Sequence, residues 1–460
     1  MKIFKSKIMT FFIFLFIFFI NIANSFSLKE FGFDNFYDLD KKFLVSDSYN
    51  QDDVQKFLPL FQEIITLFKN RLIKDNWLQD EEWDFDSKKS LEFTMKDLKL
   101  SHDFIKSYLD SGYGDEVLNI NKKQNNYVQK IVGSRESNFI AIGDIHGNYN
   151  TLSKIISSLI KRRILNNQLE LLQDYYIFFL GDVTDRGPQN LKILTLIMLL
   201  MVINQDMDTS YDGFCRDKVF FIRGNHENIG NYYKDVIYID DLDSDDKKSK
   251  RHSLIKELEN FDGVLVEDED GIYMDYPSNI PDFLNKFIWS FFNLLPVATY
   301  FKVNQEAILL THGGWAETYE SYNILIEDKV FAIDLIDNIQ ANSFLWDDIR
   351  PIKDNILKNT RGDGIKTLSS RYVLDNINKG NTIPIKTIIK GHDHIIPKWF
   401  YNKNDDFGLK EFTPGFSNIG SKKFLIIVTI AGPVESANYN TGYVEAVYDL
   451  TKFILLYRKV

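Results

Sequence analysis

Acidic, amide and imidazole side chains recur beside glycine in this sequence, each time directly after a short apolar run. Gly143-Asp-Ile-His-Gly147 follows the run 139–142, and Gly181-Asp-Val-Thr-Asp-Arg-Gly187 follows the run 175–180. Arg223-Gly-Asn-His-Glu227 follows the run 219–222. Carboxylate oxygens and imidazole nitrogens bind divalent metals in hydrolases, and the planar fork of arginine suits phosphate oxygens. The pattern therefore indicates metal-assisted chemistry on a phosphorylated substrate.

Two more histidines stand at the ends of apolar runs. His312 follows the run 307–310 and is succeeded by Gly313 and Gly314, whereas His392 follows the run 385–389. Any one of these blocks is also consistent with an ordinary turn or a salt-bridged helix start. Five such blocks, separated by longer helical patterns, favour one shared site in an α/β fold. Such sites form where the carboxyl ends of strands meet at a sheet edge.

These blocks resemble the signatures of the phosphoprotein phosphatases, the metal-dependent Ser/Thr phosphatase family within the calcineurin-like metallophosphoesterases. GDxHG, GDxxDRG and GNHE are all unbroken, and the resemblance covers roughly residues 138–450. Leu345-Trp-Asp-Asp348 is similar to the LWxD block, Asn359-Thr-Arg-Gly362 to the NDRG element, and the stretch 436–442 to the SAPNYxG loop with one residue missing. The resemblance implies a calcineurin-like β-sandwich flanked by helices, of the α/β class, with a mainly helical N-terminal extension.

The same resemblance implies a role for each matching residue. The metal ligands would be Asp144 and His146 for a first divalent cation, Asp182 bridging both, and Asn225, His312 and His392 for the second. Manganese is the preferred metal, with iron or zinc as alternatives. Phosphate would be bound by Arg186, Arg361 and Asn225, with Tyr439 beside it. His226, held by Asp185, would be the general acid after direct attack by a hydroxide bridging the metals.

The chain departs from the family pattern in two places. The family's arginine before the last metal histidine is replaced by Lys390, and Gly391-His-Asp-His394 follows. Wider calcineurin-like phosphoesterases use a second histidine at this spacing as a ligand, so His394 is either a seventh ligand or a histidine outside the metal site. The loop 436–442 lacks the family's proline, which leaves the alignment of Tyr439 open.

Three functions remain open on this basis. The favoured one is hydrolysis of phosphoserine and phosphothreonine in proteins, with phosphotyrosine as a further substrate. A dinucleoside polyphosphate hydrolase would share GDxHG and the GNH core, but that class lacks an acid at the position of Asp185 and the spacing from Trp346 to Arg361. The third is a secreted or membrane-tethered binding protein whose site is blocked, for example by the charged stretch 240–250.

Composition and the N-terminus limit the partners and the compartment. The 460-residue chain has a net charge of -11, which argues against nucleic acid as a partner. Cys215 is the only cysteine, so no intrachain disulfide can form. Three lysines precede the apolar run 8–20, and Ala23 and Ser25 follow it. This predicts a signal peptide and a secreted protein, or a periplasmic one in a bacterium, with an uncleaved membrane anchor as the alternative.

We therefore expect three parts in the chain. Residues 1–25 are the signal peptide, residues 26–133 a mainly helical extension, and residues 134–460 the catalytic domain. Apolar residues recur at helical spacing between 54 and 73, which supports the helical assignment of the extension.

Overall fold

A computed structural model describes most of the chain from residue 126 onward and a shorter N-terminal segment. The described residues are 27–45, 126–134, 137–204 except 173, 217–228, 264–268, 271–275, 291–327, 331–359 except 351, 364–392, 398–403, 406–411, 426–429, 442–449 and 452–459, together with residues 60, 64, 254, 257 and 288. All structural statements below concern these residues.

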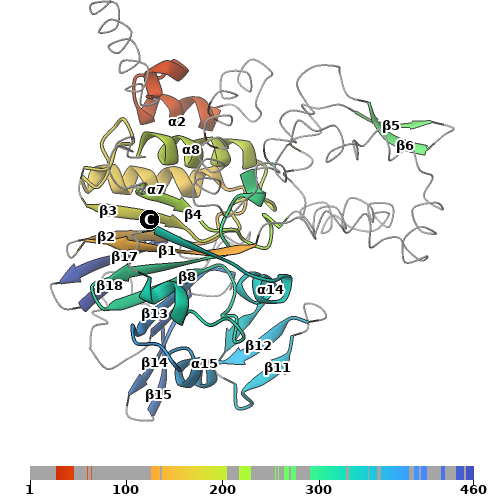
Figure 1. The fold of residues 1–460 in the computed structure, drawn as a ribbon. Coiled ribbons are helices and arrows are strands. Elements are labelled where there is room, and N and C mark those ends of the chain that lie inside the picture. The colour runs from red at the N-terminus through yellow and green to blue at the C-terminus, as the bar shows by residue number, and fades with distance from the viewer. Residues whose placement is uncertain are drawn as a thin grey trace, which may run out of the picture.

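Two β-sheets form the centre of the protein (Figure 1). The five-stranded sheet has the order β18-β17-β2-β3-β4, with β18 Lys452–Lys459, β17 Gly442–Asp449, β2 Asn138–Ile142, β3 Tyr175–Phe179 and β4 Val219–Phe221. The eight-stranded sheet has the order β15-β14-β16-β13-β8-β7-β1-β9. Its strands are β15 Asp406–Glu411, β14 Lys398–Lys403, β16 Ile426–Thr429, β13 Ile385–Lys390, β8 Glu306–Thr311, β7 Ala298–Val303, β1 Tyr127–Gly133 and β9 Phe331–Leu335.

Aromatic side chains join the two sheets face to face. The ring of Phe301 on β7 lies 5.5 Å, centroid to centroid, from Phe139 on β2 and 5.5 Å from Phe178 on β3. Phe139, Phe178 and Phe301 are fully buried. Edge-to-face rings at these distances add to the stability gained from apolar burial. The sandwich predicted from the sequence resemblance is confirmed.

Two helices cover the outer face of the five-stranded sheet (Figure 1). They are α7 Tyr149–Lys161 and α8 Asn190–Ile203. The side chain of Asn148 caps α7 by accepting a hydrogen bond from the Thr151 N–H at 3.1 Å. Residues 190–202 of α8 are all buried, and this agrees with a helix that is apolar on every side.

The N-terminal segment packs on these helices. It contains the short 3₁₀ helix η1 Leu28–Phe31 and α2 Phe36–Val45, and Figure 1 shows α2 beside α7 and α8. Phe36 and Phe43 are buried in the same hydrophobic core as the sheet residues. The Nζ of Lys192 on α8 donates a hydrogen bond to the Phe43 carbonyl at 2.6 Å. Residues 27–45 therefore share their core with the five-stranded sheet and its helices.

Smaller elements complete the structure. Helices α13 Tyr322–Ile326, α14 Asn338–Trp346 and α15 Ser370–Asn376 accompany a three-stranded sheet of β10 Asp348–Arg350, β12 Lys366–Ser369 and β11 Ile356–Lys358. Strands β5 Val264–Asp268 and β6 Gly271–Asp275 form an antiparallel hairpin.

One predicted boundary is wrong. Residues 127–133, assigned from the sequence to the helical extension, are β1, which pairs in parallel with β7 and antiparallel with β9 inside the large sheet. The run Tyr127–Gly133 lacks the apolar–polar alternation typical of a half-buried strand, and it is buried along almost its whole length. Of the helical pattern of residues 54–73 only Leu60 and Ile64 are described, and both are buried and helical.

The signal segment 1–25 lies outside the described residues. Within those residues, every helix is too short or too polar to cross a bilayer.

Candidate active site

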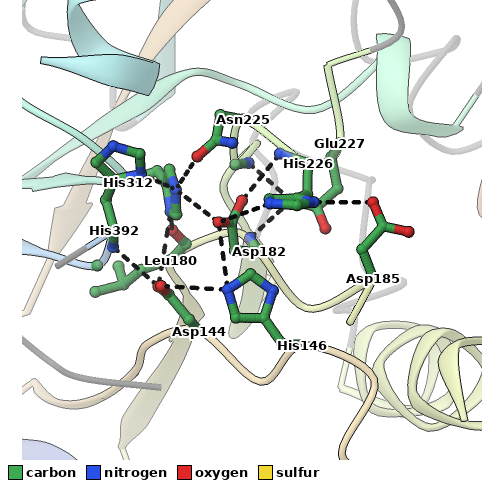
Figure 2. Close-up of polar contacts among 12 residues, drawn as sticks. Asp144, His146, Leu180, Asp182, Asp185, Asn225, His226, Glu227, His312 and His392 are labelled. Carbon is green, nitrogen blue, oxygen red and sulfur yellow. Dashed lines mark hydrogen bonds and ion pairs between the residues drawn. The ribbon is translucent and has the colours of Figure 1, made fainter. Parts of the chain in front are cut away.

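Five loops that follow parallel strands bring the predicted residues together (Figure 2). Strands β2, β3 and β4 run parallel in one sheet, and β8 and β13 run parallel in the other. Each of the five is followed directly by one of the blocks found in the sequence. Because the two sheets are stacked, the carboxyl ends of these strands meet at one edge of the sandwich, as expected for an α/β site.

The loops after β2, β3 and β4 touch through their backbones. The N–H groups of Ile145 and His146 donate to the Asp182 carbonyl at 2.9 and 3.0 Å. Gly181 has φ +89°, and a Cβ there would lie 2.4 Å from the Cα of Gly224. A side chain cannot fit at that distance, so glycine is required for the loops to approach this closely.

Asp182 lies at the centre of the imidazole groups. Its Oδ2 is 3.7 Å from His146 Nε2, 3.2 Å from His312 Nε2 and 4.0 Å from His226 Nε2. Two groups of neighbouring donor atoms share this carboxylate: His146, Asp182 and His226 form one, and Asp182, His312 and His392 form the other. The sequence resemblance assigns Asp144, and not His226, to the first cation. Figure 2 shows the imidazoles facing Asp182 from both sides. A bridging carboxylate between two clusters matches the predicted two-cation arrangement.

Hydrogen bonds to backbone carbonyls fix which imidazole nitrogen can bind a metal. His312 Nδ1 lies 2.9 Å from the Leu180 carbonyl, and His146 Nδ1 lies 3.1 Å from the Thr184 carbonyl. A carbonyl only accepts, so each Nδ1 carries the hydrogen, and Nε2, which faces Asp182, is the nitrogen that can bind a metal when the ring is neutral. His312 Nε2 is also 2.9 Å from Asn225 Oδ1 and 3.1 Å from His392 Nδ1.

Asp144 joins the two clusters from the first loop. Its Oδ1 accepts the His392 N–H at 3.0 Å, and its Oδ2 lies 3.8 Å from His146 Nε2. A Cβ on Gly391 would lie 2.4 Å from Asp144 Oδ1, so this contact also needs glycine. Burial raises the pKa of Asp144 to about 6, with His312 lowering it and Asp182 raising it.

The other charged groups of the cluster also shift one another's pKa values. Burial would raise the pKa of Asp182, but the neighbouring His312 and His226 hold it well below its usual range. Two buried carboxylates, three imidazoles and an amide oxygen converge, and carboxylates this close repel each other unless cations lie between them. This donor set fits two divalent cations.

A histidine–aspartate pair stands at the mouth of the cluster. His226 Nδ1 is 2.8 Å from Asp185 Oδ2, and their side chains are 13% and 1% exposed. Burial would lower the pKa of His226, but Asp182 and Asp185 outweigh it and raise that pKa to about 9. Arg186, the next residue along, is partly exposed and lowers the pKa of both Asp144 and His226. Its positive charge therefore acts on the centre of the site, where a phosphate would lie.

Glu227 has a role that the sequence reasoning missed. Its carboxylate accepts the N–H groups of Asp182, Val183 and Thr184 at 2.7, 3.1 and 3.2 Å. It also accepts the Thr184 hydroxyl at 2.9 Å and the Gly224 N–H at 3.0 Å. The glutamate of the GNHE block was visible in the sequence. The sequence places Glu227 directly after His226, but it gives no sign that the carboxylate binds the backbone of residues 182–184.

Three predicted residues, Arg361, Tyr439 and His394, lie outside the described residues, and their roles stay predictions. The turn before Arg361 is anchored, because Asn359 Nδ2 donates to Asp348 Oδ2 at 2.9 Å. Nothing of the charged stretch 240–250 is described, so a blocked site stays a prediction too.

Comparisons with known proteins agree with this geometry. The family model of the calcineurin-like phosphoesterases matches residues 137–396, which is more than half of the chain. The chain therefore belongs to the calcineurin-like phosphoesterase family, whose members are metal-dependent hydrolases of phosphate esters.

Individual relatives match over shorter stretches. A Caenorhabditis elegans protein named as a serine/threonine-protein phosphatase is 34% identical over 86 residues, 19% of this chain and 18% of its own length. The bis(5'-nucleosyl)-tetraphosphatase PrpE of Oceanobacillus iheyensis is 31% identical over 88 residues, 19% of this chain and 29% of its own. The chain thus spans less than a third of these relatives.

Among solved structures, a serine/threonine phosphatase from Saccharomyces cerevisiae has a TM-score of 0.43 at 16% identity, covering 72% of this chain and 84% of that one. A metallophosphoesterase from Sphaerobacter thermophilus has a TM-score of 0.35 at 13% identity, covering 70% and 88%.

Proposed function

We propose that the protein removes phosphate from phosphoserine and phosphothreonine side chains, with His226 as the proton donor to the leaving oxygen. The pair of His226 Nδ1 and Asp185 Oδ2, 2.8 Å apart, carries this proposal. A serine or threonine alkoxide is a poor leaving group and needs a proton, which an imidazolium paired with a carboxylate can give. Burial would lower the pKa of the ring, but the hydrogen bond from His226 to Asp185 raises that pKa and so favours the protonated form.

The other residues have complementary roles. Two divalent cations held by the ligand set, with manganese proposed, would supply Lewis acidity that activates water and neutralises phosphate charge. Arg186, and Arg361 by its match to the family pattern, would bind equatorial phosphate oxygens and stabilise the charge of the transition state. Asp185 orients the ring of His226 so that its Nε2 faces the site. This arrangement needs no covalent phosphoenzyme.

A dinucleoside polyphosphate hydrolase is the second candidate, favoured by the relative named as a tetraphosphatase. The leaving group of that reaction is a phosphate chain, which is stable without a proton. An Asp185–His226 acid would therefore contribute little, so the two functions differ in their dependence on His226.

One experiment separates these functions. Wild type, His226→Asn and Asp185→Asn are assayed with Mn²⁺ on a phosphoserine peptide, 4-nitrophenyl phosphate and a dinucleoside tetraphosphate. We expect His226→Asn to lower turnover of the peptide by about 10²–10⁴ and turnover of the nitrophenyl ester much less. Metal content, measured on each variant, should stay unchanged. A wild type that cleaves the tetraphosphate and leaves the peptide intact would support the second candidate.

We also propose that the protein is exported and that its mature chain begins near Phe26. The lysines before a short apolar run, followed by Ala23 and Ser25, support this. N-terminal sequencing of protein from its own host tests it. A chain beginning at Met1 in the soluble cytoplasmic fraction would overturn the export proposal and leave the catalytic one standing.

A further inference from the structure

The loop between β3 and α8 holds an unfavourable backbone conformation. Asp182, Asp185 and Arg186 have φ of +48°, +67° and +68°, in the left-handed region that side chains disfavour. These residues comprise the central ligand, the partner of the proposed acid and the proposed phosphate-binding arginine. Contacts from outside the loop must therefore keep it in this shape. Glu227 does so for residues 182–184, as described above.

Asn190 holds the second half of the same loop. Its Oδ1 accepts the Asp185 N–H at 2.7 Å, and its Nδ2 donates to the Gly187 carbonyl at 3.0 Å. Asn190 is fully buried at the first position of α8. An N–H can only donate and a carbonyl can only accept, so these two partners fix the orientation of the amide. Asn190 therefore spans the turn that carries Arg186.

A buried glutamate far along the chain holds Asn190. Glu257 Oε2 accepts the backbone N–H of Asn190 at 2.6 Å and its Nδ2 at 3.0 Å, and Oε1 accepts the Leu191 N–H at 3.2 Å. The carboxylate thus also caps the positive end of α8. Burial raises the pKa of Glu257 to about 7, although the hydrogen bonds from Asn190 lower it. The Glu257 carboxylate therefore fixes both the Asn190 amide and the first turn of α8.

The segment that carries Glu257 reaches the acid pair by a second route. The backbone N–H of Leu254 donates to Asp185 Oδ1 at 3.2 Å, while Asp185 Oδ2 faces His226 Nδ1. Both carboxylate oxygens of Asp185 therefore have a hydrogen-bond partner, and its backbone N–H donates to Asn190. The position of Asp185 depends on residues 254 and 257 as well as on its own loop.

We propose that Asn190 and Glu257 are positioning residues for the Asp185–His226 pair. The inference rests on the proposed function, because it assigns these residues to the proton-donating half of that reaction. The hydrogen bonds described above connect both residues to the second half of this loop and to the start of α8, not to the proposed metal ligands. Losing either lets Asp185 move within its loop, so that His226 is no longer held where it can protonate the leaving oxygen. Hydrolysis of an ester whose leaving group needs no proton is affected less.

The test compares two substrates that differ in their need for the acid. Asn190→Ala and Glu257→Gln are assayed with Mn²⁺ on a phosphoserine peptide and on 4-nitrophenyl phosphate. We expect kcat for the peptide to fall about tenfold or more, and kcat for the nitrophenyl ester by less than about threefold. Ile197→Val, a buried change in the same helix, is the matched control and should leave the ratio of the two kcat values unchanged.

A double-mutant cycle supplies the decisive comparison. In an Asp185→Asn background, adding Asn190→Ala should leave the ratio unchanged, because the pair it positions is already broken. Equal losses on both substrates, or a further change of the ratio in that background, would mean that Asn190 and Glu257 only stabilise the fold, and would overturn the proposal.

Amide hydrogen exchange provides a readout without activity. Exchange of residues 182–190 should become faster in Asn190→Ala and Glu257→Gln and stay unchanged in Ile197→Val. If wild type hydrolyses neither ester, the proposed function fails, and this exchange result alone decides whether the two residues position the loop. Unchanged exchange in both variants would refute the positioning.

Discussion

Replacing Glu227 by glutamine should destabilise the protein far more than one substituted oxygen suggests. The carboxylate Oε1 accepts hydrogen bonds from Val183 N, Thr184 N and Thr184 Oγ1, and Oε2 accepts them from Asp182 N and Gly224 N. Glutamine keeps one acceptor. With its oxygen on the side of Thr184, its NH₂ group must face two buried N–H donors.

The magnitude follows from these two donors. Each buried donor left without an acceptor costs about 1–3 kcal/mol, so Glu227→Gln should lower the free energy of unfolding by roughly 2–6 kcal/mol. For a chain of this length the melting temperature should then fall by about 2–6 °C. The assay is thermal unfolding at about pH 8, above the pKa of about 7 to which burial raises Glu227, so that the wild-type carboxylate is ionised.

Glu170→Gln provides the control. Glu170 is exposed, and its carboxylate accepts a hydrogen bond from Asn166. The same chemical change there should alter stability by less than about 0.5 kcal/mol. If Glu227→Gln melts within about 1 °C of wild type and Glu170→Gln behaves likewise, the loop at residues 182–184 is not held by Glu227.

Three further predictions test other parts of the structure. Asp182→Asn should abolish activity and lower metal content measured by elemental analysis, and a variant with both metals and normal turnover would contradict its bridging position. Lys192→Met removes the hydrogen bond to the Phe43 carbonyl, so limited proteolysis should cut the N-terminal segment faster than in wild type. Burial would raise the pKa of Asp174, but the hydrogen bonds from Lys218, Ser134 and Ser137 outweigh it and lower that pKa. The stability that Asp174→Asn removes should therefore be present above about pH 4 and vanish as pH falls further, as followed by thermal unfolding; an equal difference at about pH 6 and about pH 3 would refute it.

The sequence was most informative where a residue's role depends on its own strand. Asp144, Asp182 and His312 each follow a parallel strand directly, and parallel strands of a sandwich bring such residues to one edge. Their convergence could therefore be predicted from order and spacing. The sandwich could be predicted from the family resemblance. The helical periodicity of residues 54–73 lies almost wholly outside the described residues, and the described helix α2 precedes it.

The residues that escaped prediction act through backbone groups of distant segments. Glu257 and Asn190 are 67 positions apart, and nothing in either local sequence indicates that one accepts hydrogen bonds from the other. The place of strand β1 in the fold depends on distant segments in the same way. Tyr127–Gly133 is a single strand, and only its pairing with β7 and β9 shows that it belongs to the large sheet. Pairings of this kind are set by tertiary packing, which short sequence patterns do not record.

Two buried carboxylates from different segments support opposite halves of one loop, and this division has a chemical reason. Glu227 holds the half that contains Asp182, at the centre of the ligand set, whereas Asn190 and Glu257 hold the half that contains Asp185. Under the proposed mechanism, the first half would have to stay fixed for metals to bind, and the second for a proton to reach the leaving oxygen. Because separate residues hold the two halves, substitutions at Glu227 should affect metal content and turnover together. Substitutions at Glu257 should spare the metals and act on turnover of poor leaving groups alone.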